Sequence, residues 1–171
     1  MSAPPEAVAM RPVGGLRWLP VTLVVLVLDQ ASKAWMVTHL RELQIWRVLP
    51  VFNLTLRYNT GAAWSFLADA SGWQRWFFAG LAVAVGIGIT VWLRRLDGRA
   101  QRLLALSLSL ILAGALGNLI DRLRLGRVID FIEVHWNEAY FPAFNVADSA
   151  ITVGAALMLL DAWLAGRRKI H

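Results

Sequence analysis

The chain contains no cysteine among its 171 residues. This absence excludes disulfide bonds, thiolate nucleophiles and metal sites that use cysteine ligands. Charge is also scarce, because only 16% of the residues are Asp, Glu, Lys or Arg, whereas a water-soluble domain usually carries about 25%. Hydrophobic residues make up 58% of the chain. This balance argues against an ordinary water-soluble protein and indicates an integral membrane protein.

Four apolar runs are long enough to cross the hydrocarbon layer of a bilayer, which takes roughly 20 helical residues. They cover residues 18–38, 76–93, 103–120 and 149–165. Backbone groups in lipid must be hydrogen-bonded within the protein, so each run is expected to be a helix. The predicted fold class is an all-α polytopic membrane protein with four transmembrane helices. Domain limits are expected at 1–17 for a flexible cytoplasmic tail, 18–165 for a single domain and 166–171 for a basic cytoplasmic tail.

The N-terminal tail, the connection at 94–102 and the C-terminus together carry nine Lys and Arg residues, against six in the two remaining loops, a modest bias. Because cytoplasmic loops carry an excess of Lys and Arg, both termini are expected in the cytoplasm. Segments 40–72 and 122–143 then face outward. The formal charge of +6 is spread over the loops, which favours contact with anionic phospholipid and argues against nucleic acid as a partner.

The outward segments contain strand-like patterns. Residues 48–58 (VLPVFNLTLRY) and 128–136 (VIDFIEVHW) alternate partly between apolar and polar side chains. A small outward-facing antiparallel β-sheet is expected, with a short amphipathic interfacial helix near residues 64–68.

Asp148 lies in the stretch AFNVADSAI, at the point where the last apolar run begins. An ionisable residue at the edge of lipid is costly and indicates a function or a partner. Asn145 and Asp148 have the spacing of a capping box, and from spacing alone a capping role is favoured. The capping and catalytic interpretations are compatible, because a helix N-terminus stabilises an ionised carboxylate.

Asp130 is the best partner for Asp148, because the 17 residues between them can fold back and return both side chains to one depth. Two carboxylates that share a site hold one proton between them. Such a pair suits peptide hydrolysis, with Asp148 as the base and Asp130 as the acid in the resting state. Asp161 lies 13 residues beyond Asp148, ~20 Å deeper along a helix, and cannot join them.

A second polar cluster ends the third apolar run. Asn118, Asp121 and Arg122 are spaced i, i+3 and i+4, so they share one face of a helix. They are interpreted either as an interfacial ion pair with a snorkelling arginine or as a scaffold that orients the acidic pair and the substrate.

Asp29 and Lys33 are four residues apart in DQASK, and an intramembrane ion pair of structural role is favoured for them. Asn59 and Gly61 in YNTGAAWS indicate a tight turn. A Ser–Lys site formed by Ser149 and Lys33 is a weaker alternative. A zinc site would have to gather histidines that are scattered along the chain.

Four motifs appear in order along the chain. They are DQASK at 29–33, NTGAAWS at 59–65, GALGNLIDRLRLGRVIDF at 114–131 and FNVADSAI at 144–151. Together they resemble the lipoprotein signal peptidase (signal peptidase II) family, the membrane aspartic peptidases of bacteria, and the likeness runs from about residue 18 to residue 165. One departure is Ala113-Gly114, where the family often has a Gly pair, and it leaves the acidic residues untouched.

The resemblance implies that Asp130 and Asp148 are the catalytic pair. It further implies support of the active site by Asn118, Arg122 and Asn145, and it matches Asp29, Lys33, Asn59, Gly61 and Asp121 to other motif positions. The implied reaction removes the signal peptide of a diacylglyceryl-modified prolipoprotein by cutting before the lipidated cysteine. The family uses no metal or organic cofactor. A monomer in contact with phospholipid is expected, in the bacterial cytoplasmic (inner) membrane, with the active site near the outer face.

Two other classes of protein remain open from the residues. One is a proton- or ion-coupled carrier that uses Asp29, Asp121 and Asp148 as a relay. The other is a non-enzymatic membrane assembly factor in which the acids only cap helices and form ion pairs.

Overall fold

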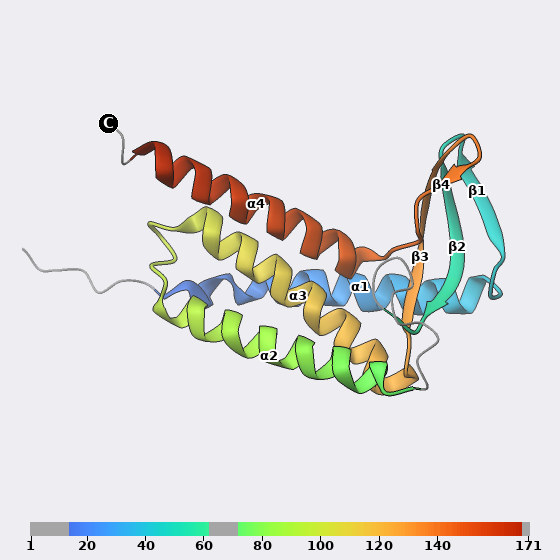
Figure 1. Ribbon diagram of the computed structural model, residues 1–171, viewed down its shortest axis with the longest axis horizontal. Coiled ribbons are helices and arrows are strands. Elements are labelled where there is room, and N and C mark those ends of the chain that lie inside the picture. Colours follow the sequence, from blue (N-terminus) through green and yellow to red (C-terminus); the bar gives the residue numbers. More distant parts are fainter. Residues whose placement is uncertain (1–13, 62–71, 169–171) are drawn as a thin grey trace, which may run out of the picture.

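Four long helices and a small sheet make up the computed structural model, which describes residues 14–61 and 72–168 (Figure 1). The helices are α1 (Leu19–His39), α2 (Gln74–Arg95), α3 (Arg102–Leu125) and α4 (Val146–Arg168). Each of these described helices is long and apolar enough to cross a membrane. The four predicted spans are therefore confirmed. Helices α2, α3 and α4 continue beyond their apolar runs at both ends, whereas α1 is displaced by one residue from its run.

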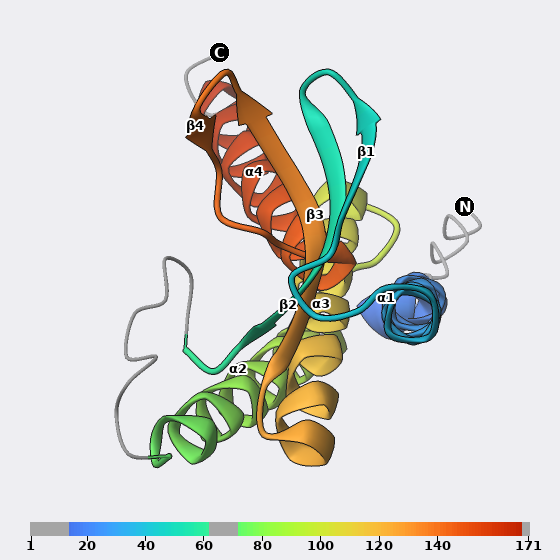
Figure 2. The same ribbon diagram turned by 90° about the vertical axis from the view of Figure 1, so that its right-hand side faces the viewer.

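Helix α3 is the centre of the bundle, since it packs against α1, α2 and α4 (Figure 2). In its most apolar stretch 67% of the residues are buried, against 22% or less in the other three helices. Large apolar side chains on α1, α2 and α4 are exposed, Leu159 at 70% and Trp76 at 64% among them. Such exposure suits contact with lipid chains rather than with water.

Helices α3 and α4 approach each other closely because small residues line their contact. A Cβ atom on Gly114 would collide with the carbonyl oxygen of Ala147 and with Ile151. A Cβ on Gly154 would come within 2.7 Å of Ile111 Cγ1. Interfaces with small residues are a common solution in membranes, where close packing replaces the hydrophobic effect. This contact fixes the position at which α4 begins.

The sheet is antiparallel throughout the part of the chain that the structure describes. Its strands are β1 (Ile45–Leu49), β2 (Phe52–Asn59), β3 (Val128–Trp136) and β4 (Ala139–Tyr140), in that order across the sheet. The predicted small sheet is confirmed, but segment 48–58 is not one strand. It breaks at Pro50 into a hairpin, because proline has no N–H to offer to the ladder. The helix expected near residues 64–68 lies outside the described residues.

The sheet lies across one end of the helical bundle, as Figure 1 shows. Met36 and Leu40 near the end of α1 pack against Leu56, Ile129 and Phe131 of the sheet. These contacts bury apolar surface between the two layers and hold the start of β3 close to the ends of the helices.

The opposite end of the bundle gathers the start of α1, the connection between α2 and α3, and the end of α4 (Figure 1). A short 3-10 helix, η1 (Gly15–Trp18), precedes α1 there. The Gly15 N–H donates to the Leu96 carbonyl, and a Cβ on Gly15 would lie 2.7 Å from the Leu93 carbonyl oxygen. Residues 14–17, assigned to the flexible tail from the sequence, are therefore packed against the bundle.

The variant Gly114→Ala tests the close approach of α3 and α4. We expect it to lower the free energy of unfolding by about 1–3 kcal/mol, because the added methyl meets a backbone carbonyl that cannot turn away. Gly88→Ala on α2 is the matched control, since nothing lies within 4 Å of its Cβ position. Thermal unfolding in detergent measures both variants, and equal stability of the two would contradict the packing described.

Candidate functional site

A cavity of about 960 Å³ opens where the sheet meets α3 and α4. Asp130 of β3 and Asp148 of α4 both line it, together with Asn59, Asn118 and Arg122. The structure therefore brings to one cavity the two acids that the sequence paired and three of the residues expected to support them.

Asn145 ends the loop before α4, and its side chain caps the helix. Its Oδ1 accepts a hydrogen bond from the backbone N–H of Asp148 at 2.9 Å, and Asp148 Oδ2 accepts one from the backbone N–H of Asn145 at 3.3 Å. This reciprocal pair is the predicted capping box, which is confirmed. The cap fixes the Asp148 carboxylate at the positive end of the helix dipole.

The same Asn145 side chain also reaches the other acid. Its Nδ2 donates to Asp130 Oδ1 at 2.7 Å and to Asn118 Oδ1 at 3.2 Å. Asn118 Nδ2 in turn donates to Asp148 Oδ1 at 2.7 Å. Asn145 is fully buried and Asn118 is 8% exposed. Two buried amides thus link the two carboxylates and hold them in a fixed relation.

Asp130 is 3% exposed, and its environment disfavours the charged form. Burial, and after it the negative charge of Asp148, raise the pKa of Asp130 to about 7, against the opposing effect of hydrogen bonds from Asn59 and Asn145 and of the Lys33 charge. Asp130 is therefore mostly protonated below neutral pH. Two linked acids, one of which retains its proton at that pH, can accept and donate protons at the same substrate.

The turn predicted at Asn59 and Gly61 borders Asp130. The Gly61 N–H donates to Asn59 Oδ1, which leaves the Asn59 amide nitrogen to donate to Asp130 Oδ2 at 3.1 Å. Arg122 Nη2 donates to the Gly61 carbonyl at 3.1 Å, and its Nη1 donates to the Asn118 carbonyl at 3.4 Å. Arg122 thus joins the end of α3 to the turn that supports Asp130.

A buried ion triad lies beneath the two acids. Lys33 Nζ lies 2.8 Å from Asp29 Oδ2 and 2.8 Å from Asp121 Oδ2, and it donates to Asn118 Oδ1 at 3.2 Å. The three charged residues are 3% exposed or less. Asp29 Oδ1 accepts the N–H of Ala147 in the first turn of α4. The predicted pair of Asp29 and Lys33 is confirmed, and Asp121 joins it from α3.

Sequence reasoning missed other members of this network. Gln30 Nε2 donates to Asp29 Oδ2 and to Asp121 Oδ1, both at 3.1 Å. Its place inside the DQASK motif was the only signal. The alternative Ser–Lys site is not formed, because Ser149 Oγ donates to the Asn145 carbonyl while Lys33 is held in the ion triad.

The characteristic sequence pattern of the family described as Signal peptidase (SPase) II matches residues 21–164. The chain belongs to the signal peptidase II family. Its sequence is 60% identical over 150 residues to a lipoprotein signal peptidase of Pseudomonas fluorescens, covering 86% of this chain and 88% of that protein. A lipoprotein signal peptidase of Pseudomonas aeruginosa is 57% identical with the same coverage.

The fold of this signal peptidase II is also found in solved structures. One, described as a bacterial membrane enzyme, has a TM-score of 0.80 and 30% sequence identity, covering 90% of this chain and 91% of that one. A second, with the same description, has a TM-score of 0.72 and 30% identity, covering 84% and 90%. The resemblance read from the four motifs is confirmed, and the protein is a multi-pass protein of the bacterial inner membrane.

The variant Lys33→Met tests the ion triad of this signal peptidase. It leaves Asp29 and Asp121 buried without a cation, so we expect a loss of about 3–5 kcal/mol of stability, as for other broken buried ion pairs. Arg95→Met, which removes an exposed cation at the end of α2, serves as the control and is expected to change stability little. Unfolding in detergent compares them, and a Lys33→Met variant as stable as the control would refute the role given to the triad.

Proposed function

We propose that this signal peptidase II is an aspartic endopeptidase that removes the signal peptide from diacylglyceryl-modified prolipoproteins and cuts before the lipidated cysteine. The single observation that carries the proposal is the pair of carboxylates, Asp130 and Asp148, linked by Asn145 at one cavity. The relatives named lipoprotein signal peptidase support the class of substrate.

In the proposed reaction the two acids divide the proton transfers. Asp148, ionised at the start of α4, takes a proton from a water molecule. At the same time the oxygen of that water attacks the scissile carbonyl carbon. Asp130, protonated, donates its proton to the carbonyl oxygen, so the tetrahedral intermediate forms as a neutral diol. The proton held by Asp148 then passes to the nitrogen of the lipidated cysteine as the C–N bond breaks. Asp130 recovers a proton as the signal peptide leaves with a new carboxyl group.

The other site residues position this pair. Asn118 and Asn145 hold the carboxylates, and Arg122 and Gly61 hold Asn59 against Asp130. A further set fixes the start of α4 against α1 and α3: Asp29, Lys33 and Asp121. This division explains why polar residues from five elements converge at one end of an apolar bundle.

The proposed orientation places both termini in the cytoplasm and the cavity near the outer face of the membrane. It is supported by the arginines at 94–102 and near the C-terminus, which lie at the end of the bundle opposite the sheet (Figure 1). A substrate held in the membrane by its signal helix and acyl chains then presents its scissile bond at the depth of Asp148. The apolar sides of α1, α2 and α4 contact phospholipid, and the proposed enzyme acts as a monomer.

The variants Asp130→Asn and Asp148→Asn test the assignment of the acids. Each is expected to lower kcat/KM by about a thousandfold or more, because an amide can neither take nor give the required proton. Asp161→Asn, lower on the same helix α4, is the matched control with expected wild-type activity. The assay measures release of the signal peptide from purified diacylglyceryl-modified prolipoprotein, and an active Asp130→Asn or Asp148→Asn variant would rule out the proposed roles.

The pH dependence tests which acid carries the proton. The pKa of Asp130 is raised to about 7 from its usual 3.8, so the protonated form is present below that value and is lost as the pH rises through it. We expect kcat/KM to fall as the pH is raised through about 7, down to the residual activity of the deprotonated acid. A kcat/KM that keeps rising from pH 6 to pH 8 is incompatible with a protonated Asp130.

A further inference from the structure

Arg57 of β2 is the direct cross-strand partner of Asp130 in β3. Such partners lie on the same face of a sheet with Cβ atoms about 4.5–5.5 Å apart, well within reach of an arginine side chain. Among the described residues, however, the Arg57 guanidinium forms its ion pair with Glu133, at 2.9 Å between Nη2 and Oε1. A cation therefore stands beside a proton-carrying acid without binding it.

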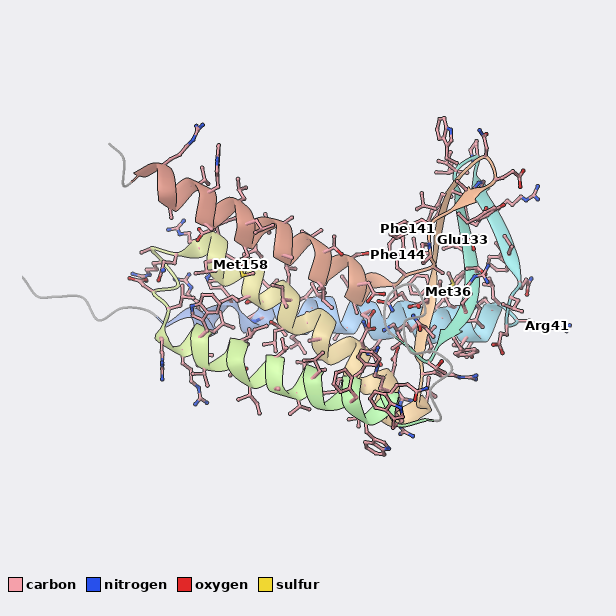
Figure 3. The ribbon with its side chains drawn as sticks, viewed as in Figure 1. Met36, Arg41, Glu133, Phe141, Phe144 and Met158 are labelled. Carbon is pink, nitrogen blue, oxygen red and sulfur yellow. The ribbon has the colours of Figure 1, made fainter. Side chains whose placement is uncertain are left out.

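A β-bulge explains how Glu133 reaches this place. In a regular strand, residues three apart point to opposite faces. The N–H groups of Phe131 and Ile132 both donate to the Phe144 carbonyl, at 2.9 and 2.8 Å, so two residues of β3 oppose one residue of the facing segment. Asp130 and Glu133 consequently line the same cavity, beside Phe144, which Figure 3 labels with Glu133 where the sheet meets the bundle.

The two partners of this ion pair differ in exposure, because the Glu133 carboxylate is buried and the Arg57 side chain is half exposed. The Glu133 side chain is 3% exposed, and that of Arg57 is 44% exposed. Glu133 Oε2 also accepts a hydrogen bond from Asn53 Nδ2 at 3.1 Å. A buried carboxylate needs a compensating cation, so Glu133 holds Arg57 on its own side of the cavity.

We propose that Glu133 is a positioning residue of the peptidase site, which binds the Arg57 guanidinium and thereby keeps this cation away from Asp130, so that Asp130 retains its proton. The inference rests on the proposed function, because it concerns the proton that Asp130 donates in that reaction. Without Glu133, the guanidinium would bind the ionised form of Asp130 and favour loss of the proton.

Among the described residues, the charged groups that the helices bring close to Asp130 are committed to partners. They are Asp29 and Lys33 from α1, Asp121 and Arg122 from α3, and Asp148 from α4. Glu42, an exposed acid in the loop after α1, also lines the cavity. Lys33 is shared between two carboxylates, and Arg122 is bonded to two backbone carbonyls. Arg57 differs from both, because a single acid holds its charged group.

The experiment measures kcat/KM for signal-peptide release as a function of pH in the variant Glu133→Gln. The part of interest is the alkaline limb, the fall of kcat/KM as the pH rises. We expect this limb to move to lower pH by about half to one unit, the size of effect that a partly solvated charge at this range produces. The substitution keeps the shape of the side chain. Asn53 Oδ1 has no hydrogen-bond partner among the described residues, so the Asn53 amide can turn over and accept a bond from the new amide.

Three further variants make the result specific. Glu133→Gln combined with Arg57→Gln removes the cation as well and is expected to restore the wild-type limb. Arg57→Gln alone leaves Glu133 as an uncompensated anion near Asp130 and is expected to move the limb to higher pH. Glu138→Gln is the matched control, since this exposed acid in the turn after β3 lies outside the cavity of Asp130.

The inference is overturned if folded Glu133→Gln has the same alkaline limb as the wild-type protein. It is also overturned if the double variant shows the same shift as Glu133→Gln alone. Infrared titration of the Asp130 carboxyl, assigned by loss of its band in Asp130→Asn, gives the same comparison without turnover and must show the same shift. If the wild-type protein cleaves no prolipoprotein, the proposed function fails, and the infrared titration still decides whether Glu133 controls the proton on Asp130.

Discussion

The site depends on one buried residue, Asn145, which binds both acids at once through its side chain and its backbone N–H. Its side-chain oxygen and its backbone N–H engage Asp148 as a helix cap, while its side-chain nitrogen donates to Asp130 in the sheet. Capping is a local contact, whereas the bond to Asp130 spans the two layers of the fold. The capping role and the proposed catalytic role of Asp148 are therefore compatible, because the cap positions the acid.

The rest of the structure makes this contact possible in a membrane. Gly114 allows α4 to lie directly against α3, and the triad centred on Lys33 holds the first turn of α4 from below. Lys33 pairs with both carboxylates, and this pairing lowers the cost of burying the three charged groups at the end of an apolar bundle. The sheet carries Asp130 over the end of the bundle, where a cavity can admit water and an extended peptide.

The sequence predicts the parts of this arrangement that are local. The four apolar runs predict the spans, and the spacing of Asn145 and Asp148 predicts the cap. Each of these patterns involves residues close together in the sequence, within one helix or at its start. The joining of Asp121 to Lys33 and the neighbourhood of Arg57, Asp130 and Glu133 depend on helix packing, strand register and a bulge. None of these features produces a periodic pattern in the sequence. Segment 48–58 has the pattern of one strand, but the chain turns at Pro50 and the segment belongs to two strands of a hairpin.

The central claim is that Asp130 and Asp148 share one proton near neutral pH. A potentiometric difference titration between the wild-type protein and the double variant Asp130→Asn with Asp148→Asn, both in the same detergent, counts that proton directly. The account predicts that the wild-type protein binds one proton more than the variant at about pH 6 and loses it as the pH rises through about 7. A difference of zero or of two protons at pH 6 would contradict it.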